Sequence, residues 1–185
     1  MDVVKHFEPP RIDYTKLAEG LQHYQSLGYI YQEVPWVVSR EATDATLPPE
    51  ATVTSVQYGD LVGSAEQSFL ELMRRGQTIL KACAITPCFR IEDRYDNLHH
   101  AYFMKLELIN AEVTQENLWQ IIQDAQSFFQ RFVETEVEQT GVDTYDIVDK
   151  YRKIELGSYG IRTFTGVPYI YGTGVALPRL DSALH

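Results

Sequence analysis

Two neighbouring segments of this chain, residues 89–92 and 102–108, alternate polar and apolar side chains as half-buried β-strands do. Successive side chains of a strand point to opposite faces, so each segment has one polar and one apolar face. We expect the segments to pair as an antiparallel hairpin with a loop near Asp93–Leu98. This hairpin would gather five side chains on one surface: Arg90, Glu92, Phe103, Lys105 and Glu107.

That surface has the chemistry of a nucleotide site. A guanidinium group binds phosphate through paired hydrogen bonds, and an aromatic ring stacks on a base. The competing interpretation of Arg90 and Glu92 is an exposed ion pair, which is common and weakly stabilising. For Phe103 the alternative is core packing, and for His99 and His100 it is an ordinary loop.

A second distinctive segment, Tyr171–Arg179, alternates small residues with apolar ones and ends in Pro178-Arg179. Its small residues are Gly172, Gly174 and Ala176. The structural alternative is a strand that packs closely against a helix. Proline suits the first position of a helix, so we expect a short terminal helix from Pro178.

The two segments together resemble the signature motifs of class II aminoacyl-tRNA synthetase catalytic cores. The second motif of that family is an F-R-x-E strand and a loop, followed by a basic residue or His. A Phe follows four residues on and an acid four residues after that. His99, Phe103 and Glu107 keep this register. The third motif ends in an acid–arginine pair, in which Arg179 fits the arginine and Pro178 replaces the acid.

The resemblance spans Tyr14 to His185 and implies an α+β fold, with an antiparallel β-sheet flanked by helices. Residues 1–185 would form a single catalytic domain, small and free-standing, without an anticodon-binding domain. A first motif is similar to residues 14–38, where Pro35 takes the place of the motif's proline. In that family this motif forms a two-fold interface, so the resemblance implies a homodimer.

The resemblance also implies roles for these residues. Arg90 would hold the α-phosphate and the substrate carboxylate, and Glu92 the adenine or the amino group. Phe103 would stack on adenine, with Arg179 on its other face and reaching the γ-phosphate, while His99 would touch phosphate. The candidate catalytic residues are therefore Arg90, Glu92 and Arg179, and the ATP-binding candidates are Arg90, Glu92, His99, Phe103 and Arg179.

A third element, residues 153–162, places the carboxylate of Glu155 before glycines that allow another group to approach closely. ATP chemistry uses magnesium held between protein and phosphate oxygens, so Glu107 or Glu155 is the candidate Mg²⁺ ligand. The segment is similar to the phenylalanyl, phosphoseryl and pyrrolysyl branch of the family. Arg162 instead resembles an arginine of the aspartyl and asparaginyl branch that reads a substrate carboxylate. The short link over 163–171 favours the first branch.

Periodicity predicts the remaining elements. We expect helices at Tyr14–Leu27, Ala65–Arg75 and Thr114–Gln139, because apolar residues recur there at helical spacing. In synthetases a serine-acid turn before such a helix faces the amino-acid pocket, which makes Ser64, Glu66 and Gln67 candidates for substrate binding. Further strands are expected at Tyr29–Val38, Thr78–Ala84, Tyr145–Val148, Lys153–Leu156 and Val167–Val175, and a loop at Ser39–Thr54.

Composition limits the function classes. With 44% hydrophobic and 23% charged residues the chain is ordinary globular material, and no apolar run is long enough to span a bilayer. Residues 1–6 lack the apolar core of a signal peptide, and Cys83 and Cys88 lack metal-site spacing, which predicts reduced thiols in a cytoplasmic protein. A formal charge of -10 argues against a broad nucleic-acid surface.

The sequence thus predicts ATP-dependent activation of an amino acid or small carboxylate to an acyl-adenylate. The cofactors would be ATP and Mg²⁺, and the acceptor would be tRNA or another molecule. The alternative is a non-catalytic synthetase paralogue that binds a ligand and regulates a partner. Pro178 and the short chain favour that alternative.

Overall fold

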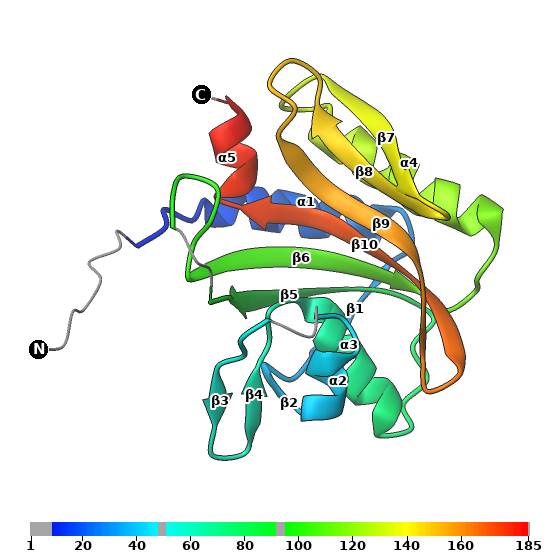
Figure 1. Ribbon diagram of the computed structural model, residues 1–185. Coiled ribbons are helices and arrows are strands. Elements are labelled where there is room, and N and C mark those ends of the chain that lie inside the picture. Colours follow the sequence, from blue (N-terminus) through cyan, green and yellow to red (C-terminus); the bar gives the residue numbers. More distant parts are fainter. Residues whose placement is uncertain (1–8, 48–50, 92–94, 185) are drawn as a thin grey trace, which may run out of the picture.

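A seven-stranded sheet forms the centre of the computed structural model, which describes residues 9–47, 51–91 and 95–184 (Figure 1). Its strands pair antiparallel except for the parallel pair of β1 and β5, so the predicted antiparallel α+β class is confirmed. In sheet order the strands are β1 (Ile30–Tyr31), β5 (Lys81–Phe89), β6 (Tyr102–Asn110), β10 (Val167–Leu177), β9 (Glu155–Phe164), β8 (Thr144–Asp149) and β7 (Thr135–Gly141).

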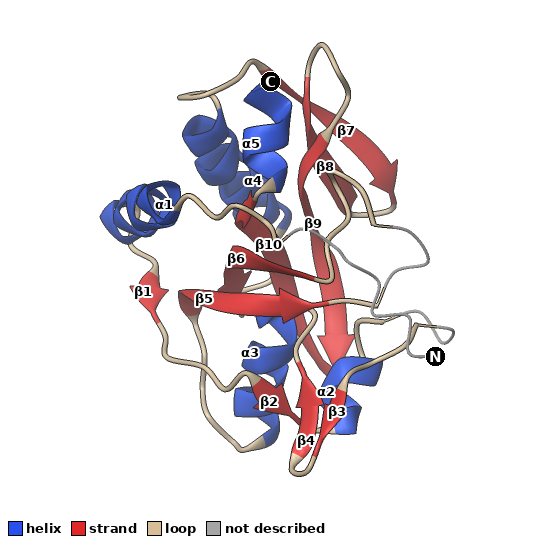
Figure 2. Cartoon of the chain, turned by 90° about the vertical axis from the view of Figure 1, so that its left-hand side faces the viewer, coloured by secondary structure: helices blue, strands red, loops and turns tan. Residues whose placement is uncertain are grey.

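Helices cover both faces of this sheet (Figure 2). One face packs against α1 (Tyr14–Ser26) and α4 (Gln115–Phe129), with α5 (Arg179–Leu184) at its end. The other packs against α3 (Ala65–Arg74), which lies beside α2 (Arg40–Asp44). A small second sheet has the order β2 (Val37–Val38), β4 (Gly59–Leu61) and β3 (Ser55–Val56). Among the described residues, none of the helices has the length and apolar character needed to cross a membrane.

The alternation of β6 decides which face holds the site. Leu106 and Leu108 are buried in the core under α1 and α4, as the sequence predicts. The side chains that alternate with them, Lys105 and Glu107, therefore point to the face that carries α3. This face is the one on which residues far apart in the sequence meet.

Three element predictions need correction. The helix predicted to Gln139 ends at Phe129, and residues 135–141 pair with β8 as an edge strand, in which β-branched Thr135 and Val137 fit. The strand predicted over 29–38 is two short strands in different sheets, because Pro35 between them has no N–H to donate. The loop predicted over 39–54 contains α2, whose N-cap Ser39 accepts from the Ala42 N–H.

The other expected elements are present with shifted ends. The strand predicted to start at Thr78 is β5, which runs on to Phe89, so Arg90 lies just beyond its end. The backbone N–H of Arg90 still donates to the Ala101 carbonyl, at 3.0 Å, which continues the hairpin pairing. The terminal helix begins at Arg179, directly after Pro178.

Candidate functional site

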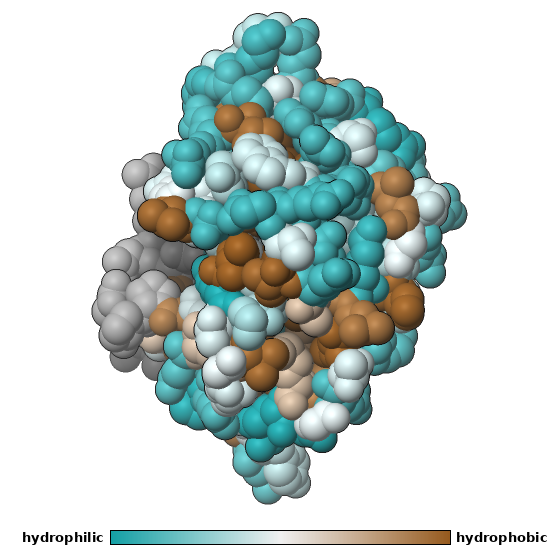
Figure 3. Space-filling model, turned by 90° about the vertical axis from the view of Figure 1, so that its right-hand side faces the viewer, coloured by the Kyte–Doolittle hydropathy of each residue, from teal (hydrophilic) through white to brown (hydrophobic). Residues whose placement is uncertain are grey.

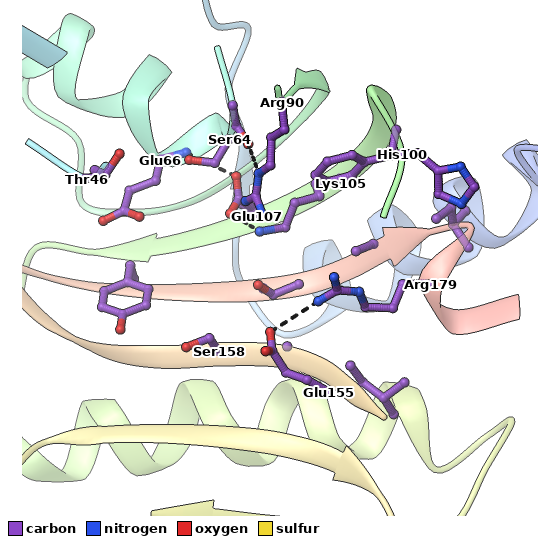
Figure 4. Close-up of a pocket in the computed structure, with 18 of the residues that line it drawn as sticks. Thr46, Ser64, Glu66, Arg90, His100, Lys105, Glu107, Glu155, Ser158 and Arg179 are labelled. Carbon is purple, nitrogen blue, oxygen red and sulfur yellow. Dashed lines mark hydrogen bonds and ion pairs between the residues drawn. The ribbon is translucent and has the colours of Figure 1, made fainter. Parts of the chain in front are cut away.

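One pocket opens on the α3 face of the sheet, between the turn before α3 and the ends of β6, β9 and β10 (Figure 4). Nearly all the site residues predicted from the sequence line it, although they come from segments up to 115 positions apart. Glu92 lies outside the described residues. The predicted residues that line the pocket are Ser64, Glu66, Gln67, Arg90, His99, Phe103, Glu107, Glu155, Arg162 and Arg179.

Arg90 and Phe103 form the first part of the pocket. The Arg90 guanidinium carbon lies 5.1 Å from the centroid of the Phe103 ring, within the range of a cation–π contact. The Nε of Arg90 donates to the carbonyl oxygen of Gly63, at 3.2 Å. A cation and an aromatic face therefore lie side by side, and the cation has no carboxylate partner among the described residues.

Arg179 and Glu155 lie at the opposite end of the pocket from Glu66 (Figure 4). The Nη1 of Arg179 is 3.5 Å from the Oε1 of Glu155, and its Nη2 donates to the Leu98 carbonyl at 3.4 Å. A carboxylate of β9 thus contacts the arginine that follows Pro178. In the third motif of class II synthetases, an acidic residue occupies the position that Pro178 has in this chain.

The side chain of Glu66 is buried at the inner end of the pocket, where it makes several contacts. Its carboxylate accepts from Arg162 Nη1 at 2.6 Å and from the Tyr169 hydroxyl at 2.7 Å. Burial raises the pKa of Glu66, while Arg162 and Tyr169 oppose that rise. Arg162 also lies over the ring of Tyr171, 4.1 Å from its centroid. The arginine considered for reading a substrate carboxylate is therefore already paired with a protein carboxylate.

Gln67 shapes the turn beside Glu66. Its Oε1 accepts from the Gly63 N–H at 2.8 Å, and its Nε2 donates to the hydroxyl of Thr46 at 2.9 Å. Ser64 is the N-cap of α3, but its side chain makes no capping hydrogen bond. Gln67 therefore holds the turn that places Glu66 in the pocket.

Glu107 fits magnesium less well than the sequence suggests. Its Oε1 accepts from Lys105 at 2.6 Å and its Oε2 from the Glu66 N–H at 3.1 Å, so both oxygens have protein partners. No group of three metal-ligating side chains occurs in the part of the chain that the structure describes. Glu155 fits better, because it is partly exposed and Mg²⁺ in nucleotide sites uses one or two carboxylates together with phosphate oxygens.

His99 lies at the rim, where its Nδ1 contacts the Asp96 carboxylate at 2.9 Å. Hydrogen bonds, first from the Leu98 N–H and then from His99, lower the pKa of Asp96 to about 2. The pocket also has lining residues to which the sequence assigned no role, among them Lys105, Ser158 and Thr173. The alternation of side chains along β6 predicts the face on which Lys105 lies. The positions of Ser158 and Thr173 depend on the register of β9 with β10.

Comparison with known proteins identifies the fold. No protein-family model and no curated protein sequence matches the chain. Among solved structures it is similar to the seryl-tRNA synthetase of Pyrococcus horikoshii complexed with ATP, with a TM-score of 0.74 and 18% identity over 91% of this chain and 49% of that one. It is also similar to PylSc, a pyrrolysyl-tRNA synthetase of Desulfitobacterium hafniense, with a TM-score of 0.72 and 18% identity over 97% and 68% of the two chains.

A third match is the cytoplasmic serine-tRNA ligase of Naegleria fowleri in complex with AMP, with a TM-score of 0.69 and 14% identity over 89% of this chain and 51% of that one. The chain thus spans about half the length of the two seryl enzymes. Identity this low establishes the fold alone. The protein has the fold of a class II aminoacyl-tRNA synthetase catalytic domain.

Proposed function

We propose that this protein activates an amino acid or a related small carboxylate with ATP, giving an acyl-adenylate and pyrophosphate. The observation that carries the proposal is the meeting of Arg90, Phe103 and Arg179 with Glu155 in one pocket. Two cations for phosphates, a ring for a base and an accessible carboxylate are the groups that ATP chemistry needs. Two of the similar structures are described as complexes with ATP or AMP, which supports the choice of nucleotide.

In the proposed reaction a carboxylate oxygen of the substrate attacks the α-phosphorus of ATP. The bond from the α-phosphorus to the bridging oxygen breaks, and pyrophosphate leaves with that oxygen. Arg90 would neutralise charge on the α-phosphate and orient the carboxylate, so the chain acts by positioning and charge stabilisation. Phe103 would stack on the adenine, with Arg179 on the other face of the base and reaching the γ-phosphate.

A magnesium ion would neutralise phosphate charge when bound, and Glu155 is the residue proposed to hold it. Glu92 keeps its proposed contact with adenine or the amino group, and His99 its proposed contact with phosphate. At the inner end, Glu66 with Ser64 and Gln67 would contact the amino-acid part of the substrate. Arg162 would assist through Glu66.

The acceptor of the acyl group is a separate proposal. The three similar structures are of tRNA synthetases, so tRNA is one candidate. The formal charge of -10 favours a different acceptor, because nucleic-acid surfaces are usually basic. We also propose that residues 1–185 act as a single catalytic domain.

A non-catalytic, ligand-binding role in regulating a partner is the second candidate. Pro178 favours it, because this residue takes the place of the acid that precedes the arginine in the resembled motif. ATP–pyrophosphate exchange, screened across the amino acids with Mg²⁺ present, distinguishes the two. Exchange with any one amino acid supports adenylation. ATP binding without exchange for any amino acid or small carboxylate supports the regulatory role.

A further inference from the structure

The first turn of α3 is attached to the sheet by a residue far away in the sequence. The first N–H groups of a helix have no partner within the helix and need an outside acceptor. Ser64, the N-cap residue, provides none through its side chain. The Glu66 N–H instead donates to the Oε2 of Glu107, 41 positions along the chain, at 3.1 Å. A carboxylate in this place is also favoured by the positive end of the helix dipole.

Lys105 fixes the orientation of that carboxylate. Its Nζ lies 2.6 Å from the Oε1 of Glu107, and the two side chains are only 11% and 7% exposed. Charges buried to this degree need a partner, since removal of either one leaves the other desolvated and unpaired. The two residues project from the same face of β6, two and four positions beyond Phe103, so the proposed adenine site and this pair share one strand.

The same turn is held from a second strand. Arg90, at the end of β5, donates to the Gly63 carbonyl, while Gln67 closes the turn on the Gly63 N–H. The Glu66 carboxylate is in turn engaged by Arg162 from β9. The turn over 63–67 is therefore set relative to the proposed nucleotide site by two direct hydrogen bonds, from Arg90 to the Gly63 carbonyl and from the Glu66 N–H to Glu107. Figure 4 shows Glu66, Arg90 and Glu107 close together at this turn.

We propose that Lys105 and Glu107 are a positioning pair, which docks the N-terminus of α3 on β6 and so places the Glu66 end of the pocket. The kinetic consequence rests on the proposed function. A displacement of the carboxylate substrate relative to the α-phosphorus lowers the rate steeply, because in-line attack needs close alignment. In this proposal the pair acts through Glu66, whose N–H binds Glu107.

Hydrogen exchange at single backbone amides of the full chain tests the docking without any substrate. Glu107→Ala removes the acceptor, and the Glu66 amide should then exchange about fivefold faster or more, the size of a lost cap. Amides of α4 should not change. Thr114→Ala is the matched control, because it removes the side-chain cap of α4 from the Asn117 N–H and should accelerate exchange only there.

Unchanged exchange at Glu66 in Glu107→Ala would overturn the docking. Equal acceleration in α3 and α4 would overturn it as well, since it reports loss of global stability. If Glu107→Ala does not fold, Lys105→Met carries the test, because it removes the cation and keeps the carboxylate. Faster exchange at Glu66 is again expected, and no change would overturn the role of the pair.

Kinetics of amino-acid activation test the positioning role. Glu107→Gln should raise the KM for the carboxylate substrate about tenfold, while the Kd of ATP, measured by calorimetry, changes less than about twofold. Glu116→Gln, an exposed acid in the first turn of α4, is the control and should match wild type. If the Kd of ATP rises in Glu107→Gln as much as the KM for the carboxylate substrate, the positioning role of the pair is overturned. If wild type activates no carboxylate, the proposed function fails, whereas the exchange experiment still decides the docking.

Discussion

Arg90 and Phe103 lie at the loop end of the β5–β6 hairpin, and neither side chain belongs to the two hydrophobic core clusters. Arg90 contributes its backbone N–H to the hairpin, and this bond survives truncation of the side chain. The contact between guanidinium and ring is partly exposed and adds little to stability. At the residue scale, function and stability can therefore be separated at both positions.

Arg90→Ala should lower ATP-dependent activation about 10²–10³-fold, because it removes a cation from the developing charge at the α-phosphate. The melting temperature should stay close to wild type. Arg131→Ala is a matched control, since Arg131 also lies over aromatic rings, Phe128 and Phe132, far from the pocket. Pyrophosphate exchange and thermal denaturation measure the two effects. An unfolded Arg90→Ala protein would make the residue structural, and normal exchange would remove it from the site.

Phe103→Ala should weaken ATP binding by about 1–3 kcal/mol, the usual contribution of a base that stacks on an aromatic ring. Calorimetry with ATP measures this, and thermal stability should change only modestly. Phe132→Ala should behave in the opposite way, because Phe132 packs against the main core. A large fall in melting temperature with ATP affinity retained in Phe103→Ala would place this ring in the core instead.

At the element scale, Glu71 joins the two helices on the pocket face. Its side chain is 2% exposed and accepts from Arg74 and Arg75 on its own helix. It also accepts from the hydroxyl and the N–H of Ser39, the N-cap of α2. The hydrogen bond from Arg74, followed by those from Ser39 and Arg75, holds the pKa of Glu71 well below its usual range. Ionised Glu71 therefore stabilises the packing of α3 on α2.

This lowered pKa gives a pH-dependent prediction. The folded state keeps Glu71 ionised at pH values where the unfolded chain binds a proton, so stability falls as the pH falls. Glu71→Gln should lower the free energy of unfolding at neutral pH. The deficit relative to wild type should be constant above about pH 4.3, the pKa of a free Glu, and shrink below it. Urea denaturation across pH measures this, with Glu116→Gln as control; a pH-independent deficit would exclude the mechanism.

At the scale of the whole molecule, the sequence predicts a homodimer built on residues 14–38. Tyr29 in this segment is buried, and its hydroxyl donates to the carboxylate of Asp124 of α4. Tyr14, Ile30 and Trp36 are exposed at 66%, 66% and 54%, and β1 is an edge of the sheet. The face drawn in Figure 3, the right-hand side of Figure 1, carries apolar side chains in several clusters separated by hydrophilic ones.

We expect a two-fold dimer through this segment, because exposed apolar groups beside a free strand edge mark an interface. Sedimentation at micromolar concentration should give twice the chain mass of 21.2 kDa. Ile30→Glu should give monomers, while Val142→Glu, at an exposed hairpin turn, should not. A wild-type monomer that still activates its substrate would show that residues 14–38 resemble the first motif without forming its two-fold interface.

The sequence by itself determined the local features of the protein. The period of two along residues 102–108 established which side of β6 is buried, because alternation is a property of each strand alone. The N-caps of α1 and α4, Asp13 and Thr114, are likewise local features, since a cap bonds within its own turn. The register of His99, Phe103 and Glu107 was enough to place these residues in one pocket.

Only the tertiary structure decided the partners across the sheet. Arg162 binds Glu66, 96 positions away, because β9 lies two strands from β6 in the sheet and α3 packs on that face. Glu107 caps α3 although its motif position suggested a metal ligand. Residues 135–141 became a strand because β8 offered an edge for pairing. Such contacts depend on strand order and on which elements become neighbours, and local periodicity carries no information about either.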